Sequence, residues 1–250
     1  MKKIVVVLAA VLGSGVGLGH AADLRMPVKA PLAAVPVFSW TGCYVGVEGG
    51  GNWGRSQHTQ DDPFFVGAAT VFGLNQTNGI NLSGGIAGGT IGCNYQAGNF
   101  VFGLEDDFSW TNKKGTANLI PPFVTADTAT TSESWLGTFR GRAGYAWDRW
   151  FIYGTGGAAI TRESYALCSP GTATGCAGSA ANVAGWNAGV GFEYAFLGGW
   201  SVKAEYLHVD FGKHTFTRAP TPTGFFAARD VSLSDDMARV GINYAFMPMK

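Results

Sequence analysis

The chain has 250 residues, with 17 Lys and Arg against 17 Asp and Glu, so its formal net charge is zero. This neutrality argues against a nucleic-acid partner, because nucleic-acid-binding proteins need a basic surface. Only 14% of the residues are charged, 13% are aromatic and 38 are glycine, about twice the glycine share of an average domain. The glycines have no Gly-X-Y period, which excludes collagen, and the aromatic, charge-poor composition excludes a disordered chain.

The amino-terminal residues are typical of a signal peptide. Two lysines precede an apolar run from Ile4 to Leu12, and small residues follow up to Ala21. The apolar run is too short for a membrane-spanning helix, which needs roughly 20 residues. We therefore expect residues 1–21 to be a signal peptide that exports the chain. Residues 22–40 are rich in Pro and Ala and are predicted to be an extended periplasmic lead-in.

Past the lead-in, segments alternate large apolar residues with small or polar ones, which is the period-two pattern of strands with two different faces. We expect eight strands, at about residues 42–54, 79–93, 99–110, 133–147, 150–165, 182–196, 200–211 and 234–246. The connections alternate in length. The long ones are residues 55–78, 111–132, 166–181 and 212–233, and the short ones are residues 94–98, 148–149 and 197–199.

An even number of strands with short turns at one end and long loops at the other is typical of outer-membrane barrels. Residues 41–246 are therefore predicted to form an all-β, eight-stranded antiparallel transmembrane β-barrel, followed by a short tail at 247–250. The termini would lie in the periplasm and four long loops outside the cell. Soluble lipocalins also have eight strands, so the two faces of the strands must decide between these classes.

The faces favour a membrane barrel. In the sixth predicted strand Trp186, Val190 and Phe192 share one face, whereas Gly191 and Glu193 share the other. A face of glycines and charges is too small and polar for a solvated exterior, so the apolar face is predicted to contact lipid. Aromatic residues near strand ends predict an interfacial girdle. These residues are Trp40, Tyr44, Trp110, Trp147, Trp150 and Trp200.

Asp106 interrupts the apolar face, since it shares parity with Phe102, Leu104 and Phe108. It would lie either above the lipid band or beside a bulge, and the sequence does not decide between them.

Charges on the inner face need partners, because an unpaired buried charge is costly. Pairing about the short turn at Gly198 sets Glu193 opposite Lys203, and pairing about the centre of the last long connection, near residue 222, sets Glu205 opposite Arg239. We expect an interior salt-bridge network of Glu48, Glu105, Asp107, Arg140, Arg142, Glu193, Lys203, Glu205 and Arg239. The interior of an eight-stranded barrel is only wide enough for side chains, so an open pore is not expected.

Four cysteines in an exported chain suggest two disulfides. Cys168 and Cys176 lie within one long connection, which predicts a bridge between them. Cys43 and Cys93 fall at the short-turn end of neighbouring strands. They could form a second bridge or remain free as small apolar residues.

No catalytic, cofactor-binding or metal-binding residues are predicted. The chain has no CxxC motif for zinc. Residues 154–159 match G-x-G-x-x-A, but no helix or correctly spaced acidic residue follows, so no nucleotide cofactor is expected. His208, Asp210 and His214 have no clear serine partner and are interpreted as a polar rim at the membrane surface.

Several sequence runs together resemble a family of small alphaproteobacterial outer-membrane barrels, called outer-membrane immunogenic proteins or porin-family proteins, of the OmpA-type class. The runs are AADL (21–24), WTGCYVG (40–46), IGCNYQ (91–96), FGLE (102–105), RGRAGY (140–145), WSVKAEY (200–206) and RVGINYAF (239–246). The resemblance covers nearly the whole exported chain. It implies a surface-exposed integral protein of the Gram-negative outer membrane with no catalytic residues.

The resemblance also implies an assembly signal that ends in the last aromatic residue and is read by the outer-membrane insertion machinery. Here the signal would comprise Val240, Ile242, Tyr244 and Phe246. Four further residues follow Phe246, which departs from the family pattern. Cys43 and Cys93 stand where the family has aromatic residues, and Asp106 replaces a glycine.

The sequence therefore predicts a structural and surface-display protein that contacts outer-membrane lipid and lipopolysaccharide. One alternative is a narrow porin-like channel for ions or small solutes. Another is an adhesin or receptor for a host or environmental ligand, since the long connections carry aromatic clusters. These clusters are Phe64, Phe65, Val66 and Phe72 in the first connection and Phe225 and Phe226 in the fourth.

Overall fold

The computed structural model describes residues 38–60, 65–66, 69–70, 76–118, 128–168, 176–217 and 228–248. The predicted signal peptide, most of the lead-in and the central parts of the four long connections lie outside these residues. The aromatic clusters proposed for ligand contact fall in those connections, and only residues 65–66 of them are described, as backbone. Within the described ranges no helix is long and apolar enough to cross a membrane.

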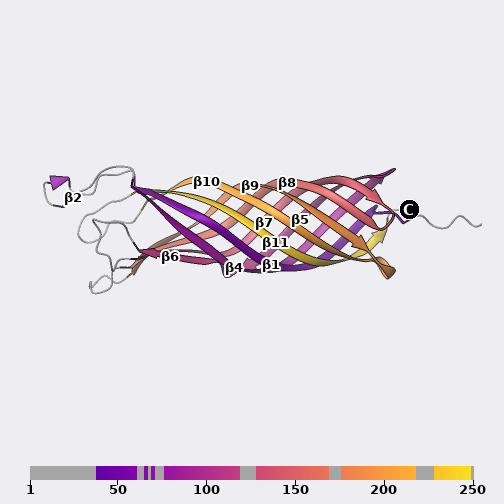
Figure 1. Cartoon of the computed structure of the whole chain (residues 1–250), viewed down its shortest axis with the longest axis horizontal. Helices are drawn as coiled ribbons and strands as arrows, with labels where there is room; N and C mark the ends of the chain where they lie inside the picture. Colours follow the sequence, from indigo (N-terminus) through magenta and orange to yellow (C-terminus); the bar gives the residue numbers. More distant parts are fainter. Residues whose placement is uncertain are drawn as a thin grey trace, which may run out of the picture. The chain divides into compact units, whose positions relative to one another are not determined.

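Eight long antiparallel strands form the fold (Figure 1). They are β1 (Gly42–Gln60), β4 (Gln76–Ala97), β5 (Phe100–Thr111), β7 (Thr128–Trp147), β8 (Trp150–Cys168), β9 (Cys176–Ala195), β10 (Trp200–Thr217) and β11 (Ala228–Pro248). Each pairs with its neighbour in the chain, and β1 pairs with both β4 and β11, so the sheet closes into a barrel. Closure leaves no unpaired strand edge facing lipid.

Three short strands complete the described chain. β6 (Lys114–Asn118) pairs with β4 and β7, so it continues the row of β5 after a break at Asn112 and Lys113. β2 (Phe65–Val66) and β3 (Ala69–Thr70) form a separate two-stranded sheet within the first long connection. The barrel wall therefore has eight rows of strand.

All eight predicted strands are present, but most are longer than expected and run into the predicted long connections. β4 begins at Gln76 and β7 at Thr128, whereas residues 79 and 133 were the expected starts. The sequence pattern weakens where the outer face becomes polar. The ladder of backbone hydrogen bonds does not need an apolar face once it leaves the lipid, so pairing continues.

The short-turn end is built by residues in the left-handed region. Gly98 has a φ of 62° and Asp148 a φ of 53°, at the turns after β4 and β7. The third turn is a 3-10 turn at Leu197–Gly199, in which Gly198 has a φ of 78°. Such tight connections fix the register of each hairpin, because only one pairing satisfies the turn geometry.

The two faces of the barrel differ as predicted. On β5 the outer residues from Phe100 to Trp110 are exposed and, apart from Asp106, large and apolar, whereas the alternate residues face inward and all but Gly103 are buried. At about 3.3 Å per residue and a tilt near 40°, this stretch rises about 25 Å, which matches the apolar band of outer-membrane barrels. A 19-residue strand such as β1 rises about 48 Å on the same geometry, so the strands extend well past the band.

Two residues predicted for the lipid-facing girdle are instead inside. Trp40 and Tyr44 are 7% and 4% exposed. Trp40 precedes the first strand and turns into the lumen at the short-turn end, where its ring lies 5.3 Å from that of Phe151. Its backbone N–H donates to Gln96 Oε1 at 2.7 Å. Tyr44 has the parity of Glu48 and therefore points inward. The other predicted girdle residues, Trp110, Trp147, Trp150 and Trp200, are exposed.

Asp106 lies within the apolar band. It is exposed on the outer face between Leu104 and Phe108, and it pairs in register with Ile91 and Phe139. Both ladders of β5 continue through this position without a register shift. Neither of the two expected explanations, a position above the band or a bulge, therefore applies.

Candidate functional site

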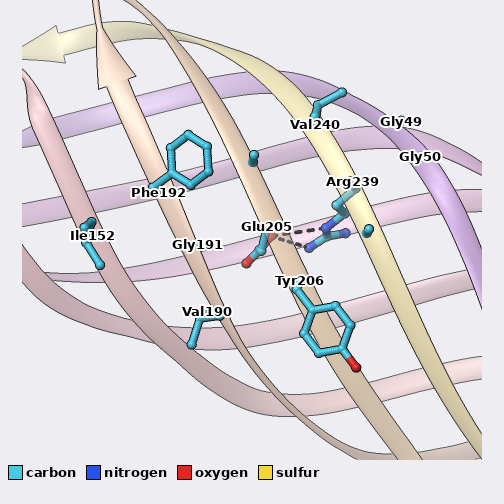
Figure 2. Close-up of a pocket in the computed structure, with 12 residues that line it drawn as sticks. Gly49, Gly50, Ile152, Val190, Gly191, Phe192, Glu205, Tyr206, Arg239 and Val240 are labelled. Atoms are coloured by element: carbon cyan, nitrogen blue, oxygen red, sulfur yellow. Dashed lines mark hydrogen bonds and ion pairs between the residues drawn. The ribbon is translucent and has the colours of Figure 1, made fainter.

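The outer wall of the barrel is apolar, and the functional groups lie behind it. Figure 2 shows a shallow groove on this wall between Ile152, Phe192 and Val240. The same view shows Glu205 and Arg239 joined by hydrogen bonds. Their side chains are 4% and 3% exposed, so they belong to the lumen. The candidate site is this charged lumen.

Arg239 of β11 connects three carboxylates that come from three other strands. Its Nε and Nη2 atoms donate to Glu205 Oε2 at 3.1 and 3.0 Å. Its Nη1 and Nη2 atoms donate to Asp107 at 3.1 Å. Nη1 also pairs with Glu48 of β1, across the seam where the barrel closes. Glu205 lies directly opposite Arg239 in the ladder, which is the register that the centre of the last long connection predicts.

Arg140 of β7 forms a second centre beside the first. Its guanidinium pairs with Glu105 and Glu205, and its Nη2 lies 2.9 Å from Asp107 Oδ2. Asp107 also accepts a hydrogen bond from the Thr138 hydroxyl at 2.5 Å. Since Glu205 and Asp107 each contact both arginines, the two centres form one network.

Arg142 and Lys203 extend the network toward the short-turn end. Arg142 Nη1 lies 3.3 Å from Glu105 and 3.2 Å from Glu193. Lys203 Nζ lies 3.0 Å from Glu48 and 3.2 Å from Glu105. The structure thus brings all nine predicted interior charges together. Each of them is at most 6% exposed.

One predicted pair has the expected register but not the expected contact. Glu193 lies opposite Lys203 in the ladder. The ion pairs of the described lumen nevertheless join Lys203 to Glu48 and Glu105, and Glu193 to Arg142. In a narrow barrel a long side chain reaches the opposite wall as easily as its ladder neighbour, so register alone does not fix the partner.

Neutral groups support the charged ones. The Tyr44 hydroxyl donates to Glu105 at 2.5 Å, and the Asn243 amide donates to Glu193 at 2.8 Å. The Arg142 guanidinium lies 4.7 Å from the centroid of the Tyr44 ring. Sequence reasoning missed Tyr44 as a luminal residue, although its parity with Glu48 carries that signal.

A second charged cluster, which sequence reasoning missed, lies nearer the long connections. Lys113 Nζ is 2.7 Å from Glu133 and also pairs with Asp235, and Glu163 lies opposite Glu133 across the ladder of β7 and β8. Asp235 shares parity with Arg239, so its inward position could have been predicted. Glu133 could not, because a bulge between Glu133 and Leu136 reverses the parity of β7.

The cysteines lie at opposite ends of the barrel strands, Cys43 and Cys93 near the short turns and Cys168 and Cys176 near a long connection. A disulfide joins Cys43 and Cys93, which lie opposite each other on β1 and β4 near the short-turn end. Cys93 is exposed on the outer face. Cys168 is disulfide-bonded, and the ladder of β8 and β9 sets it opposite Cys176.

The residues of the predicted assembly signal lie on the outer face of the last strand. Val240, Ile242, Tyr244 and Phe246 are all exposed there. The strand β11 continues past Phe246, and its last two residues, Met247 and Pro248, pair with the start of β1.

The polar rim residues do not converge on one point. His208 Nδ1 lies 2.8 Å from Asp236 Oδ1 on the outer face. Asp210 accepts a hydrogen bond from the Gly212 backbone at 2.7 Å, and His214 contacts the Phe211 carbonyl. Among the described residues no group of His, Cys, Asp and Glu is arranged to hold a metal ion.

Comparison with known proteins agrees with this architecture. The 31 kDa outer-membrane immunogenic protein of Brucella melitensis is 31% identical, over 96% of this chain and 99% of its own. The 25 kDa outer-membrane immunogenic protein of Brucella canis is 26% identical, over 98% of this chain and 99% of its own.

Among solved structures, the outer membrane protease OmpT of Escherichia coli aligns with a TM-score of 0.50 and 10% identity, over 85% of this chain and 99% of its own. That likeness concerns the fold alone. Residues 39–246 match the family described as outer membrane protein beta-barrel domain. With its closed ring of eight strands and its apolar outer wall, the chain belongs to this family and is a protein of the Gram-negative outer membrane.

Proposed function

We propose that the protein is a structural and display component of the outer membrane, with a side-chain-filled lumen and long connections on the extracellular side. The observation that carries the proposal is the luminal network. Nine charged side chains from six strands meet at one level of the barrel, and each is nearly inaccessible to solvent. A continuous water path for solutes would have to break these contacts, which is costly because each break leaves a buried charge.

The mouth at the short-turn end supports the same proposal. Trp40 packs with Phe151, Tyr153 and Val101 in an apolar cluster, and Phe38 lies against it. This cluster covers the network on the side where the chain enters the barrel. The surroundings of such a protein are outer-membrane lipid and lipopolysaccharide, and its insertion requires the outer-membrane assembly machinery. The proposal is of a non-enzymatic protein, which the names of the Brucella relatives support.

Conductance across a planar lipid bilayer tests the filled lumen. The purified wild-type barrel should give no steady openings. A variant that combines Arg140→Ala with Arg239→Ala removes two guanidinium groups from the centre of the network and should conduct if it folds. Its folding is checked by different gel mobility of boiled and unboiled samples. Large, steady openings from the wild type would refute the proposal and favour the narrow-channel alternative.

Display is tested separately on intact cells. A short epitope tag is inserted into the connection at residues 218–227, and into the turn at Asp148 and Arg149 as a control for the opposite end. Antibody should label intact cells that carry the first insertion and should reach the second only after the outer membrane is permeabilised. The reverse pattern would contradict the proposed orientation. Loss of attachment to a surface after deletion of residues 218–227 would instead support the adhesin alternative.

A further inference from the structure

The second luminal cluster contains more acid than base. Glu133 of β7 and Glu163 of β8 lie directly opposite each other in the ladder. Asp235 reaches the same region from β11, and Lys113 from the break between β5 and β6. The four side chains are at most 3% exposed. Three carboxyl groups therefore share a single ammonium group in a part of the lumen closed to solvent.

Lys113 does not satisfy all three acids. It pairs with Glu133 at 2.7 Å and with Asp235, whereas Glu163 has no ion pair among the described residues. Glu163 Oε1 also has no hydrogen-bond partner there. The inward residues beside Asp235 on β11 are Leu233 and Met237, which cannot donate a hydrogen bond. The cluster thus contains a buried carboxyl oxygen with nothing to neutralise it.

This arrangement is unfavourable if every acid is ionised. Like charges directly opposite each other in a ladder are destabilising, and a buried unpaired carboxylate is more so. Binding a proton removes one negative charge and supplies a donor to the neighbouring carboxylate. We propose that the Glu133–Glu163–Asp235 cluster is a proton-binding site whose occupancy holds the half of the barrel nearest the long connections together. As the pH rises the proton dissociates, and the backbone hydrogen bonds in this half of the barrel open more often.

The electrostatics agree with the geometry. Glu133 and Glu163 lie beyond the last large outer residues of their strands, Trp135 and Ile160, and so outside the membrane-spanning part. Burial raises the pKa of Glu163 to about 7, with Asp235 raising it further and Lys113 lowering it. Burial also raises the pKa of Glu133, to about 8. The nearby Lys113 lowers this pKa, and the nearby Asp235 raises it.

The raised pKa values of Glu133 and Glu163 determine how the stability of this half of the barrel depends on pH. A carboxyl group whose pKa is raised in the folded state binds more protons folded than unfolded. Its stabilising effect is complete below the ordinary pKa of about 4.5 and is lost as the pH rises through about 7 for Glu163 and about 8 for Glu133. The half of the barrel nearest the long connections should therefore be more stable at pH 5 than at pH 8.

Hydrogen exchange measured by mass spectrometry on the folded protein in detergent micelles tests the proposal. After correction for intrinsic exchange rates, protection of residues 128–136 and 161–168 should fall at least about tenfold between pH 5 and pH 8. Protection of residues 139–147, which lie in the apolar band, should not change. Glu163→Gln should reduce the fall, because the amide is neutral at every pH, and the part that remains comes from Glu133, whose pKa is raised to about 8. Asp148→Asn, at an exposed turn, should leave the fall unchanged.

Three results would overturn the proposal. The first is wild-type protection that is independent of pH, and the second is a Glu163→Gln variant whose protection falls as much as that of the wild type. The third is recovery of protection at pH 8 when NaCl or MgCl₂ is added, which would assign the site to a metal cation. If Glu163→Gln does not fold, Lys113→Met takes its place. Removing the ammonium makes the cluster bind its proton more tightly, so the fall should move to higher pH.

Discussion

The luminal network predicts a strong energetic coupling between Glu205 and Arg239. The test replaces each by alanine, singly and together. The structure separates the effects of the two changes. Glu205→Ala removes two hydrogen bonds from Arg239 and the contact with Arg140, but it leaves Arg239 paired with Asp107 and Glu48. Arg239→Ala instead takes a cation from three carboxylates at once.

The magnitudes follow from these contacts. Removing one partner of a buried ion pair costs about 3–5 kcal/mol, and we place Glu205→Ala at the lower end and Arg239→Ala at the upper end. Two charge-assisted hydrogen bonds join the pair directly, each worth about 1.5–3 kcal/mol before relaxation of the neighbours. The double variant should therefore lose about 2–3 kcal/mol less than the two single losses together.

The free energy of unfolding is measured by urea titration of the barrel in lipid vesicles, with tryptophan fluorescence as the signal. Gel mobility of unboiled samples confirms that each variant starts folded. Lys213→Ala combined with Arg239→Ala is the matched control. Lys213 forms an exposed ion pair with Asp230, and its ladder partner Ser232 is seven residues from Arg239 along β11. Losses in this control should add within about 0.5 kcal/mol. The same additivity for Glu205 and Arg239 would refute direct coupling in the lumen.

Three further predictions concern the wall of the barrel. Asp106→Leu should stabilise it by about 1–2 kcal/mol, because the carboxyl group faces lipid, and an unchanged or lower urea midpoint would contradict this. Gly50→Ala should prevent folding, since a Cβ there would lie 2.1 Å from a backbone oxygen of β11, and the unboiled sample should then migrate on a gel like the boiled one. Gly49→Ala, whose Cβ would have its nearest atom at 3.5 Å, should fold normally. Equal behaviour of the two variants would disprove the argument. Replacing Cys43 and Cys93 by serine removes a cross-link between residues 50 apart and should cost at most about 4 kcal/mol of unfolding free energy, whereas a midpoint equal to that of the wild type would mean that the bridge adds nothing.

The sequence was most informative where two simple rules act together. Strand residues alternate between the faces, and a turn of two or three residues permits only one register. These rules were enough to set Glu193 opposite Lys203 and to place both inside. The midpoint of the long connection between β10 and β11 likewise set Glu205 opposite Arg239. Chain closure then brings Glu48 to the same arginine, because β1 must pair with β11 if no edge is left in lipid.

Local departures from regular strand structure limited the prediction. The bulge between Glu133 and Leu136 reverses which residues point inward, and no feature of the sequence marks it. The break before β6 turns Lys113 into the lumen although the predicted strand had already ended. Trp40 lies before the first strand, so alternation does not apply to it. These positions depend on contacts between distant segments, which a period along one chain does not encode.

The strands rise about 20 Å higher than the apolar band requires, on the geometry given above. This upper part is a wall of paired backbone with polar side chains facing outward, such as Arg162 and Asn182, which lie opposite each other on β8 and β9. Antibodies that bind this wall must recognise residues from two or more strands at once, so boiling destroys their epitopes. Sera raised against the folded barrel and sera raised against the denatured chain should consequently recognise different sites on the same protein.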